Sequence, residues 1–235
     1  MNGESAYLDL LDQHITPQSD ALDIGCGHGE VARSIAFKCR SVLAYDRVAS
    51  YIQIAQKAAR DQDIRNLIYK WADSSAEANY GQVHIPAEDN AFNLLISRRG
   101  PLHWLEDARR VARSSAVIIQ LNPLETPIPV WADKLPEPLR SAAGIDYKFG
   151  MLNSVKHRLR ACGFVLHSAW TYDVPEIFDD PYDLYIRLSW GYLPNEVPSW
   201  DGIRSLIEDI YSEHAGSSGL VMRHTRLLWK TVVNN

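Results

Sequence analysis

The sequence predicts an α/β fold in which helices cover both faces of a doubly wound, mostly parallel sheet. Three observations support this prediction. Between about residues 20 and 121, short apolar segments alternate with helical patterns, which is typical of βαβ units with right-handed crossovers. The first apolar segment runs directly into three alternating glycines. The 235 residues, of which 46% are hydrophobic, are enough to bury the core of one such domain.

The elements can be placed in order along the chain. An amphipathic helical segment is expected within residues 1–19, where it would close over the edge of a ligand site. Strands are expected at residues 21–24, 41–46, 66–71, 92–97 and 116–121. Helices are expected around residues 52–59, 103–112 and 151–161, and Gly163 would provide a left-handed cap for the last of these. Residues 74–82 show no clear helical pattern.

The junction between the first strand and the following helix carries the most specific motif. Residues 23–29 read D-I-G-C-G-H-G, so an acid and alternating glycines stand where a ligand can approach the backbone closely. A dinucleotide-binding loop would have the spacing G-x-G-x-x-G, and Glu30 occupies the position of its third glycine. The run instead resembles the D-x-G-x-G-x-G motif of class I S-adenosylmethionine-dependent methyltransferases, with a pattern like that of the type 11 group. The resemblance implies cofactor contacts from Asp23, Gly25, Cys26, Gly27, His28 and Gly29.

A second acid follows the glycine loop at the expected distance. Asp46 ends a small apolar strand about twenty residues further on, where a carboxylate can accept hydrogen bonds from both ribose hydroxyls. The alternative is that Asp46 only caps the next helix, because acids favour helix starts. The resemblance implies that Asp46 and Arg47 contact the cofactor.

Two later segments extend the resemblance to about residue 121. Asp73 and Ser74 follow the third strand, where the family contacts the adenine. Residues 85–97 are similar to the family's P-F-x-D-x-S-F-D-x-V run and end at Ser97, a further implied cofactor contact, although Asn93 replaces the usual aspartate. The resemblance implies a Rossmann-like seven-stranded sheet with an antiparallel last strand, which places the final strands at residues 164–174 and 219–233.

An insertion rich in aromatic residues is expected between these last two strands, at residues 175–218, within a single methyltransferase domain spanning residues 1–235. In this family, such an insertion often helps to cover the acceptor pocket. Tyr182, Tyr185 and Trp190 are therefore candidates for contact with a flat or apolar acceptor. The alternative is that they pack a helix against the sheet.

Three polar side chains after the fourth strand are the other acceptor-site candidates. Arg98 and Arg99 stand where doubly wound sheets place their ligands, so they could hold an acceptor carboxylate or phosphate. They could equally form ion pairs inside the protein. His103 is a candidate general base, because a neutral imidazole can accept the proton that the acceptor loses on methylation. The alternative is that His103 only begins a helix.

Composition narrows the classes of partner and compartment. A formal net charge of −5 argues against extended binding of nucleic acid. Three cysteines without paired spacing suit a reducing compartment, and no cluster has the spacing of metal ligands. The sequence shows neither a leader-like segment nor an apolar run of 18 residues, so we expect a cytoplasmic protein that does not enter the membrane.

The resemblance implies methyl transfer from S-adenosylmethionine, and we expect the acceptor to be an oxygen, nitrogen or carbon atom of a small molecule. One alternative is an RNA or protein methyltransferase whose target docks on arginines 98, 99, 109, 110 and 113. Another is a regulatory protein that binds the cofactor without turnover. The acceptor and the oligomeric state are left open by the sequence.

Overall fold

The computed structural model describes residues 3–123, 127–144, 150–190, 192–193 and 195–234. The chain divides into two compact units. The first consists of Met1–Asn122, Met151–Tyr172 and Leu227–Asn235, and the second of Pro123–Gly150 and Asp173–Arg226. The second unit therefore includes residues before the expected insertion as well as the insertion itself. A single domain spanning residues 1–235 stays a prediction.

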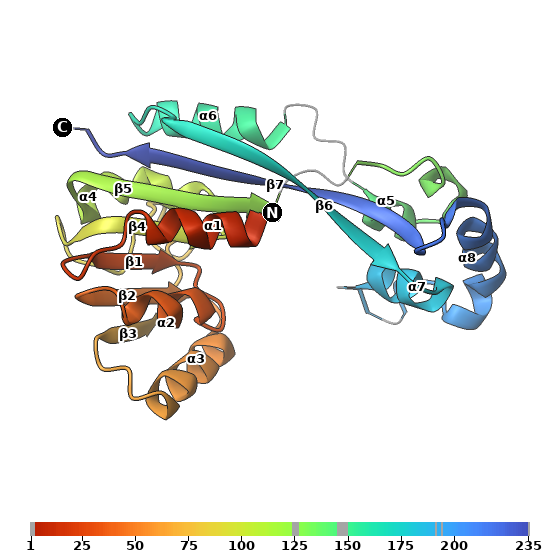
Figure 1. Cartoon of the computed structure of the whole chain (residues 1–235), viewed down its shortest axis with the longest axis horizontal. Coiled ribbons are helices and arrows are strands. Elements are labelled where there is room, and N and C mark those ends of the chain that lie inside the picture. Colours follow the sequence, from red (N-terminus) through yellow and green to blue (C-terminus); the bar gives the residue numbers. More distant parts are fainter. Residues whose placement is uncertain (1–2, 124–126, 145–149, 191, 194, 235) are drawn as a thin grey trace. The chain divides into compact units, whose positions relative to one another are not determined.

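A seven-stranded sheet has the strand order β3-β2-β1-β4-β5-β7-β6 (Figure 1). The strands are β1 (Asp20–Ile24), β2 (Ser41–Asp46), β3 (Leu67–Trp71), β4 (Phe92–Arg98), β5 (Ala112–Pro123), β6 (Ser168–Phe178) and β7 (Leu220–Val232). Strands β1 to β5 pair in parallel. At the end of β7, Ser115 N donates to Val233 O over 2.9 Å and Val233 N donates to Ala116 O over 2.8 Å, the exchange expected of antiparallel strands. The predicted doubly wound sheet with an antiparallel last strand is confirmed.

Helices connect the strands. They are α1 (Gly3–Asp12), α2 (Glu30–Ala36), α3 (Ala49–Asp61), α4 (Ala108–Val111), α5 (Leu139–Ala143), α6 (Gly150–Ala161), α7 (Pro181–Ser189), α8 (Trp200–His214) and the 3-10 helices η1 (His103–Glu106) and η2 (Ala132–Lys134). Helix α2 packs on β2, and α3 packs on β2 and β3. All five residues of β1 are buried, as a central strand covered on both faces requires. The carboxyl end of β1 is therefore held firmly where the glycine loop begins.

The end of α6 shows the predicted glycine cap. Gly163 has φ +74°, and its N–H donates to Arg160 O over 3.0 Å. Phe164 N donates to Leu159 O over 2.7 Å, which completes a Schellman motif. Because Phe164 belongs to this cap, β6 begins only at Ser168 and extends to Phe178, later than the predicted strand at residues 164–174.

The predicted helix at residues 103–112 is wrong in its extent. The chain instead forms η1 and the four-residue α4, and β5 begins already at Ala112. The carboxylate of Asp107, between the two short helices, accepts from Ile85 N over 2.7 Å and from the Arg110 guanidinium. These contacts hold the turn against the segment before β4. Residues 74–82 contain turns and no helix.

The second unit has its own hydrophobic core. Helix α7 contributes Leu184 and Leu188, and α8 contributes Ile203, Ile207 and Ile210. Side-chain caps fix where both helices begin, because Asp180 and Ser199 accept from backbone N–H groups of the first turns. Among the described residues, no helix is both long and apolar enough to cross a membrane.

Candidate active site

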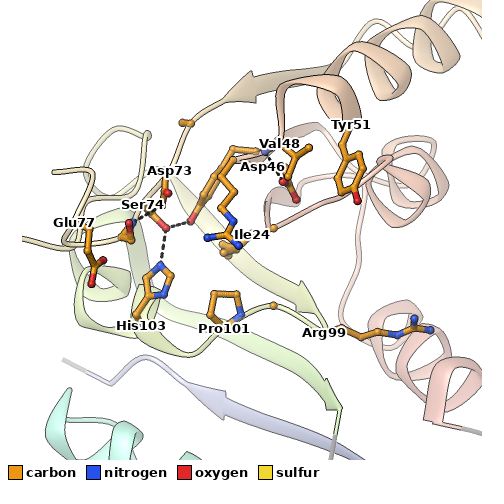
Figure 2. Close-up of a pocket in the computed structure, with 16 residues that line it drawn as sticks. Ile24, Asp46, Val48, Tyr51, Asp73, Ser74, Glu77, Arg99, Pro101 and His103 are labelled. Carbon is orange, nitrogen blue, oxygen red and sulfur yellow. Dashed lines mark hydrogen bonds between the residues drawn. The ribbon is translucent and has the colours of Figure 1, made fainter. Parts of the chain in front are cut away.

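A pocket of about 800 Å³ lies at the carboxyl ends of the parallel strands in the first unit, the position at which doubly wound sheets bind ligands (Figure 2). Its volume is within the ~300–1,000 Å³ typical of small-molecule sites. The lining residues are Ile24, Gly25, Tyr45, Asp46, Arg47, Val48, Tyr51, Ala72, Asp73, Ser74, Ser75, Glu77, Arg99, Gly100, Pro101 and His103. Seven of these lining residues are predicted site residues: Gly25, Asp46, Arg47, Asp73, Ser74, Arg99 and His103.

The glycine loop turns sharply beside this pocket. Gly25, Gly27 and Gly29 have φ values of +67°, +55° and +74°, which residues with a Cβ rarely adopt. Cys26 N donates to Tyr45 O over 3.0 Å and ties the loop to the end of β2. A Cβ on Gly27 would meet no atom within 4 Å, so the loop surface is open at this position. Gly29 instead lies against Tyr69, whose hydroxyl donates to Gly29 O over 3.0 Å.

Asp46 lies at the end of β2 and faces the pocket (Figure 2). Its Oδ2 accepts from Gly27 N and its Oδ1 from Val48 N, both over 2.9 Å. The bond from Val48, the N-cap residue of α3, shows that Asp46 does stabilise the start of this helix. Each carboxylate oxygen retains a second lone pair, so this structural role leaves Asp46 able to accept hydrogen bonds from a ligand.

Asp23 lies behind the loop rather than on the pocket wall. It is 1% exposed, and its Oδ2 has no hydrogen-bond partner among the described residues. Burial raises the pKa of this carboxyl to about 7, although the Arg98 guanidinium opposes the rise. The buried hydroxyl of Tyr7 in α1 likewise has no partner within the described part of the chain. A buried polar atom without a partner is costly, so these groups point to a missing ligand or water.

Three side chains that line the pocket form a hydrogen-bonded chain. Tyr45 Oη donates to Ser74 Oγ over 3.0 Å, and Ser74 Oγ lies 3.2 Å from Nε2 of His103 (Figure 2). Burial lowers the pKa of His103, which keeps the imidazole neutral at neutral pH. Asp73 stands beside this chain, and its Oδ1 accepts from Ser75 N over 2.8 Å. The structure thus brings Asp73, Ser74 and His103 together from separate parts of the sequence.

Arg98 and Arg99 are held by internal carboxylates. Arg98 Nη2 donates to Glu30 Oε2 over 2.7 Å, and its Nη1 lies 3.7 Å from Glu4 Oε2. Arg99 also pairs with Glu4 in α1. Arg99 lines the pocket, so α1 is anchored beside it through Glu4.

The other predicted residues have local partners. Ser97 is fully buried and donates to Ile24 O over 2.8 Å, which joins β4 to β1. The His28 ring contacts the Tyr51 ring in a tilted arrangement, with ring centroids 4.3 Å apart. The Cys26 thiol lies 3.7 Å from Gly27 O, and burial raises its pKa, so it remains protonated.

Sequence reasoning missed two amides that position the loop after β4. Gln120 Nε2 donates to Gly100 O over 2.8 Å and to Pro101 O over 3.1 Å, and Asn122 Nδ2 donates to Gly100 O over 3.3 Å. Both side chains project from β5 and are almost fully buried. The available signal was a glutamine inside the apolar run at residues 116–121, since a buried strand rarely includes an amide without a partner.

Comparison with known proteins decides what kind of site this is. Residues 21–120 match the family described as "Methyltransferase domain". This segment is thus similar to methyltransferase domains, and the fold that contains it is the Rossmann-like fold of class I S-adenosylmethionine-dependent methyltransferases. The matched segment runs from β1 to β5 and includes the glycine loop, Asp46 and Asp73. No curated protein sequence matches the chain.

Solved structures share the fold over nearly the whole chain. A candidate methyltransferase from Bacillus halodurans C-125 is 14% identical, with a TM-score of 0.68 and coverage of 98% of this chain and 100% of its own. An S-adenosylmethionine-dependent methyltransferase from Aquifex aeolicus is 13% identical, with a TM-score of 0.55 and coverage of 97% and 89%. Geranyl diphosphate C-methyltransferase from Streptomyces coelicolor A3(2), in complex with Mg²⁺, geranyl diphosphate and S-adenosylhomocysteine, is 15% identical, with a TM-score of 0.55 and coverage of 97% and 77%.

The residues at this pocket fit S-adenosylmethionine, the cofactor of the methyltransferases that share this fold. Asp23 Oδ2, behind the glycine loop, is a buried acceptor without a partner among the described residues. The open surface at Gly27 permits close approach to the loop, and Asp46 has lone pairs available for hydroxyl groups. Within the described ranges, no three His, Cys, Asp or Glu side chains form a group that could hold a metal ion.

The three aromatic candidates, Tyr182, Tyr185 and Trp190, lie in the second unit. Tyr182 and Tyr185 pack around Trp200, with ring centroids 5.1 and 5.4 Å from it. Tyr185 Oη also donates to Pro198 O over 3.0 Å. Trp190 is 80% exposed. Packing within this unit explains Tyr182 and Tyr185 in part, and contact of all three with an acceptor stays a prediction.

Proposed function

We propose that this enzyme transfers the methyl group of S-adenosylmethionine to a small molecule in the pocket at the carboxyl ends of β1 to β4. The observation that supports this most directly is the pocket itself, because glycine loop, Asp46, Asp73 and His103 converge on one concave site. When bound, the cofactor supplies an electrophilic methyl group on a sulfonium centre. Much of the catalysis in such a transfer comes from holding donor and acceptor in line in a site that excludes water.

We assign each cofactor group to a residue of this chain. Asp46 accepts hydrogen bonds from the ribose hydroxyls, and Asp73 accepts one from the adenine amino group. Asp23 faces the amine of the methionine portion, while Gly25 and Gly27 let that portion approach the backbone. The bonds from Gly27 N and Val48 N support the assignment of Asp46, because they fix its carboxylate before the ligand arrives.

The partners of the arginines favour a small molecule over a polyanion. Arg98, Arg99, Arg110 and Arg113 all form ion pairs with carboxylates. Arg109 instead donates to backbone carbonyls, among them those of Cys162 and Asn234. Each of these guanidinium groups already has a carboxylate or carbonyl partner within the protein. Their capacity to bind the phosphates of RNA is therefore reduced. The Streptomyces coelicolor neighbour, named for a geranyl diphosphate acceptor, supports the same preference.

Calorimetry with S-adenosylhomocysteine tests the cofactor assignment. Asp46→Ala is expected to weaken binding several-fold, because each lost hydrogen bond is worth about 0.5–1.5 kcal/mol. Asp61→Ala, at an exposed carboxylate of α3 paired with Lys57, is the matched control and should bind like the wild type. Because Asp46 also fixes the loop, the 2′-deoxyribose analogue of the ligand should be included. If removal of the 2′-hydroxyl weakens binding as much in Asp46→Ala as in the wild type, the assignment of Asp46 to the ribose is wrong.

The alternative of an RNA target has a separate test. Filter binding of rRNA and tRNA fragments at increasing salt should show weak binding with a shallow dependence of the affinity on salt. A steep slope would instead report the release of many counterions and would favour the RNA methyltransferase.

The three cysteines, all of which are free, support our further proposal of a cytoplasmic location.

A further inference from the structure

The hydrogen-bonded chain from Tyr45 through Ser74 to His103 has a direction. Tyr45 is 3% exposed, and burial raises the pKa of its phenol, so it keeps its proton. A buried hydroxyl must donate to a partner, and the described partner of Tyr45 Oη is Ser74 Oγ at 3.0 Å. Ser74 is itself 4% exposed. Its own proton then has one described acceptor left, Nε2 of His103 at 3.2 Å.

The direction of this chain decides where His103 carries its proton. A neutral imidazole has one nitrogen that donates and one that accepts. If Ser74 donates to Nε2, then Nε2 accepts and the proton is on Nδ1. The charges around the ring are mixed, because Asp73, Glu106 and Glu77 favour the charged form whereas Arg158 and burial disfavour it, and burial is the largest of these effects. The ring therefore remains neutral, with one nitrogen that donates and one that accepts.

We propose that Tyr45 and Ser74 are positioning residues that hold His103 with its proton on Nδ1, so that His103 offers the pocket a hydrogen-bond donor rather than a general base. Among the described residues, Nδ1 has no hydrogen-bond partner, and the ring is only partly buried in the pocket wall. Its ligand is an atom with an available lone pair, from the methyl acceptor or from the cofactor. The hydrogen bond from Nδ1 of His103 to a ligand rests on the proposed function, whereas the position of the proton on Nδ1 does not.

A proton on Nδ1 of His103 limits the chemistry of the methyl acceptor. The Nε2 lone pair is engaged by Ser74, and Nδ1 already carries a proton, so His103 cannot remove a proton without rearrangement of the chain. The methylated group is then one that needs no base at His103, such as an oxygen that is already ionised. A hydrogen bond from Nδ1 would orient that acceptor and exclude competing water from its lone pair.

Nitrogen NMR of the ligand-free, full-length protein with labelled histidine rings tests the proposal. The ring nitrogen signals that are absent from the spectrum of His103→Asn are assigned to His103. We expect a pyrrole-type resonance at Nδ1 and a pyridine-type resonance at Nε2, opposite to the tautomer that free imidazole side chains prefer. A proton on Nε2 in the wild type would overturn the proposal, because His103 would then donate to Ser74.

Three variants test whether the hydroxyl chain causes this tautomer. Ser74→Ala should shift the population towards a proton on Nε2, and Ser74→Thr, which keeps the hydroxyl, should restore the wild-type tautomer. Tyr45→Phe should give an intermediate shift, since Ser74 then has no obligatory donor. An unchanged tautomer in correctly folded Ser74→Ala would overturn the proposal. Should Ser74→Ala not fold, Tyr45→Phe and the wild-type spectrum decide.

Adding S-adenosylhomocysteine separates the two sources of the ligand atom. A shift of the Nδ1 proton with this ligand alone assigns the bond to the cofactor, and a shift only with the acceptor present assigns it to the acceptor. Loss of the Nδ1 proton on binding of either would overturn the proposal. Failure of the cofactor assignment would be visible separately, as absent binding in calorimetry with the tautomer intact.

Discussion

At the scale of single residues, the glycines of the loop are equally spaced in the sequence but are needed for different physical reasons. Gly27 and Gly29 both have positive φ, and the motif treats them alike. A Cβ on Gly29 would lie 2.1 Å from the hydroxyl oxygen of Tyr69 and 2.6 Å from the ring carbon that bears it. The third glycine is therefore required by packing against β3, whereas Gly27 is required by its backbone conformation.

Substitution of these two glycines should separate the two requirements. Gly29→Ala combines left-handed backbone strain of about 1–2 kcal/mol with overpacking of about 1–3 kcal/mol. Gly27→Ala should lower the free energy of unfolding only by the backbone strain. Denaturant unfolding of both variants measures the difference, and equal losses of unfolding free energy would contradict the role assigned to Tyr69.

Asp23 should make the stability of the ligand-free enzyme depend on pH. Its pKa is about 7 in the folded protein and 3.8 as the reference value, so the unfolded chain ionises this carboxyl first. The contribution of Asp23 to stability is therefore present below about pH 4 and is lost as the pH rises through about 7. Asp23→Asn should gain unfolding free energy relative to the wild type over this range. A difference between the two proteins that does not vary with pH would exclude this origin.

At the scale of elements, the loop after β4 is positioned by the neighbouring strand. Gln120 in β5 donates to the carbonyl oxygens of Gly100 and Pro101, and a Cβ on Gly100 would lie 2.3 Å from Ser97 Oγ. The loop therefore lies tightly against β4 while its outer side lines the pocket. Register within the parallel sheet, which pairs Ser97 with Gln120, brings these residues together.

Replacing this amide should loosen the loop. Gln120→Met keeps the approximate size but removes the donor to Pro101 O and leaves Gly100 O with only the longer bond from Asn122, at a cost of about 1–3 kcal/mol. We expect lower unfolding free energy and weaker binding of S-adenosylhomocysteine. Gln56→Met, which removes a single 3.5 Å bond from α3 to Tyr69 O, is the control and should change neither property appreciably. Wild-type affinity in Gln120→Met would show that the loop holds its position without the amide.

At the scale of the whole molecule, the proposed cofactor residues all belong to the first unit. The core of the second unit, built by α5, α7 and α8 with parts of the long strands, contains none of them. Cofactor binding stabilises the folded state by RT ln(1 + [L]/Kd), which is about 2.7 kcal/mol at a ligand concentration of 100 Kd. This stabilisation should be distributed unevenly along the chain.

Hydrogen exchange with and without S-adenosylhomocysteine measures that distribution. Amides of residues 25–29, 46–48, 73–75 and 99–103 should gain protection, because the ligand would contact or cover them. Amides of α8 should change little. Equal protection in α8 would mean that the second unit takes part in binding the cofactor, contrary to the assignment proposed here.

Much of the fold was predictable from local patterns. The strands ending at Ile24, Asp46 and Trp71 were located closely, because buried parallel strands are short apolar runs bounded by loops. The extents of η1, α4, β5 and β6 were not predictable, since Asp107 and Phe164 contact residues that are distant in sequence or complete a cap. Length of an element depends on such contacts more than on periodicity.

The sequence by itself determined the alternation of strands and helices, the glycine loop and the acids that follow it, because these features depend on neighbours along the chain. Only the tertiary structure decided that Arg98 pairs with Glu30 and Arg99 with Glu4. It also decided that Asp23 is buried with an oxygen lacking a partner among the described residues, and that Ser74 links Tyr45 to His103. The physical reason is that charge pairing, burial and the direction of a hydrogen bond are set by groups brought together across strands, and spacing in the sequence does not encode them.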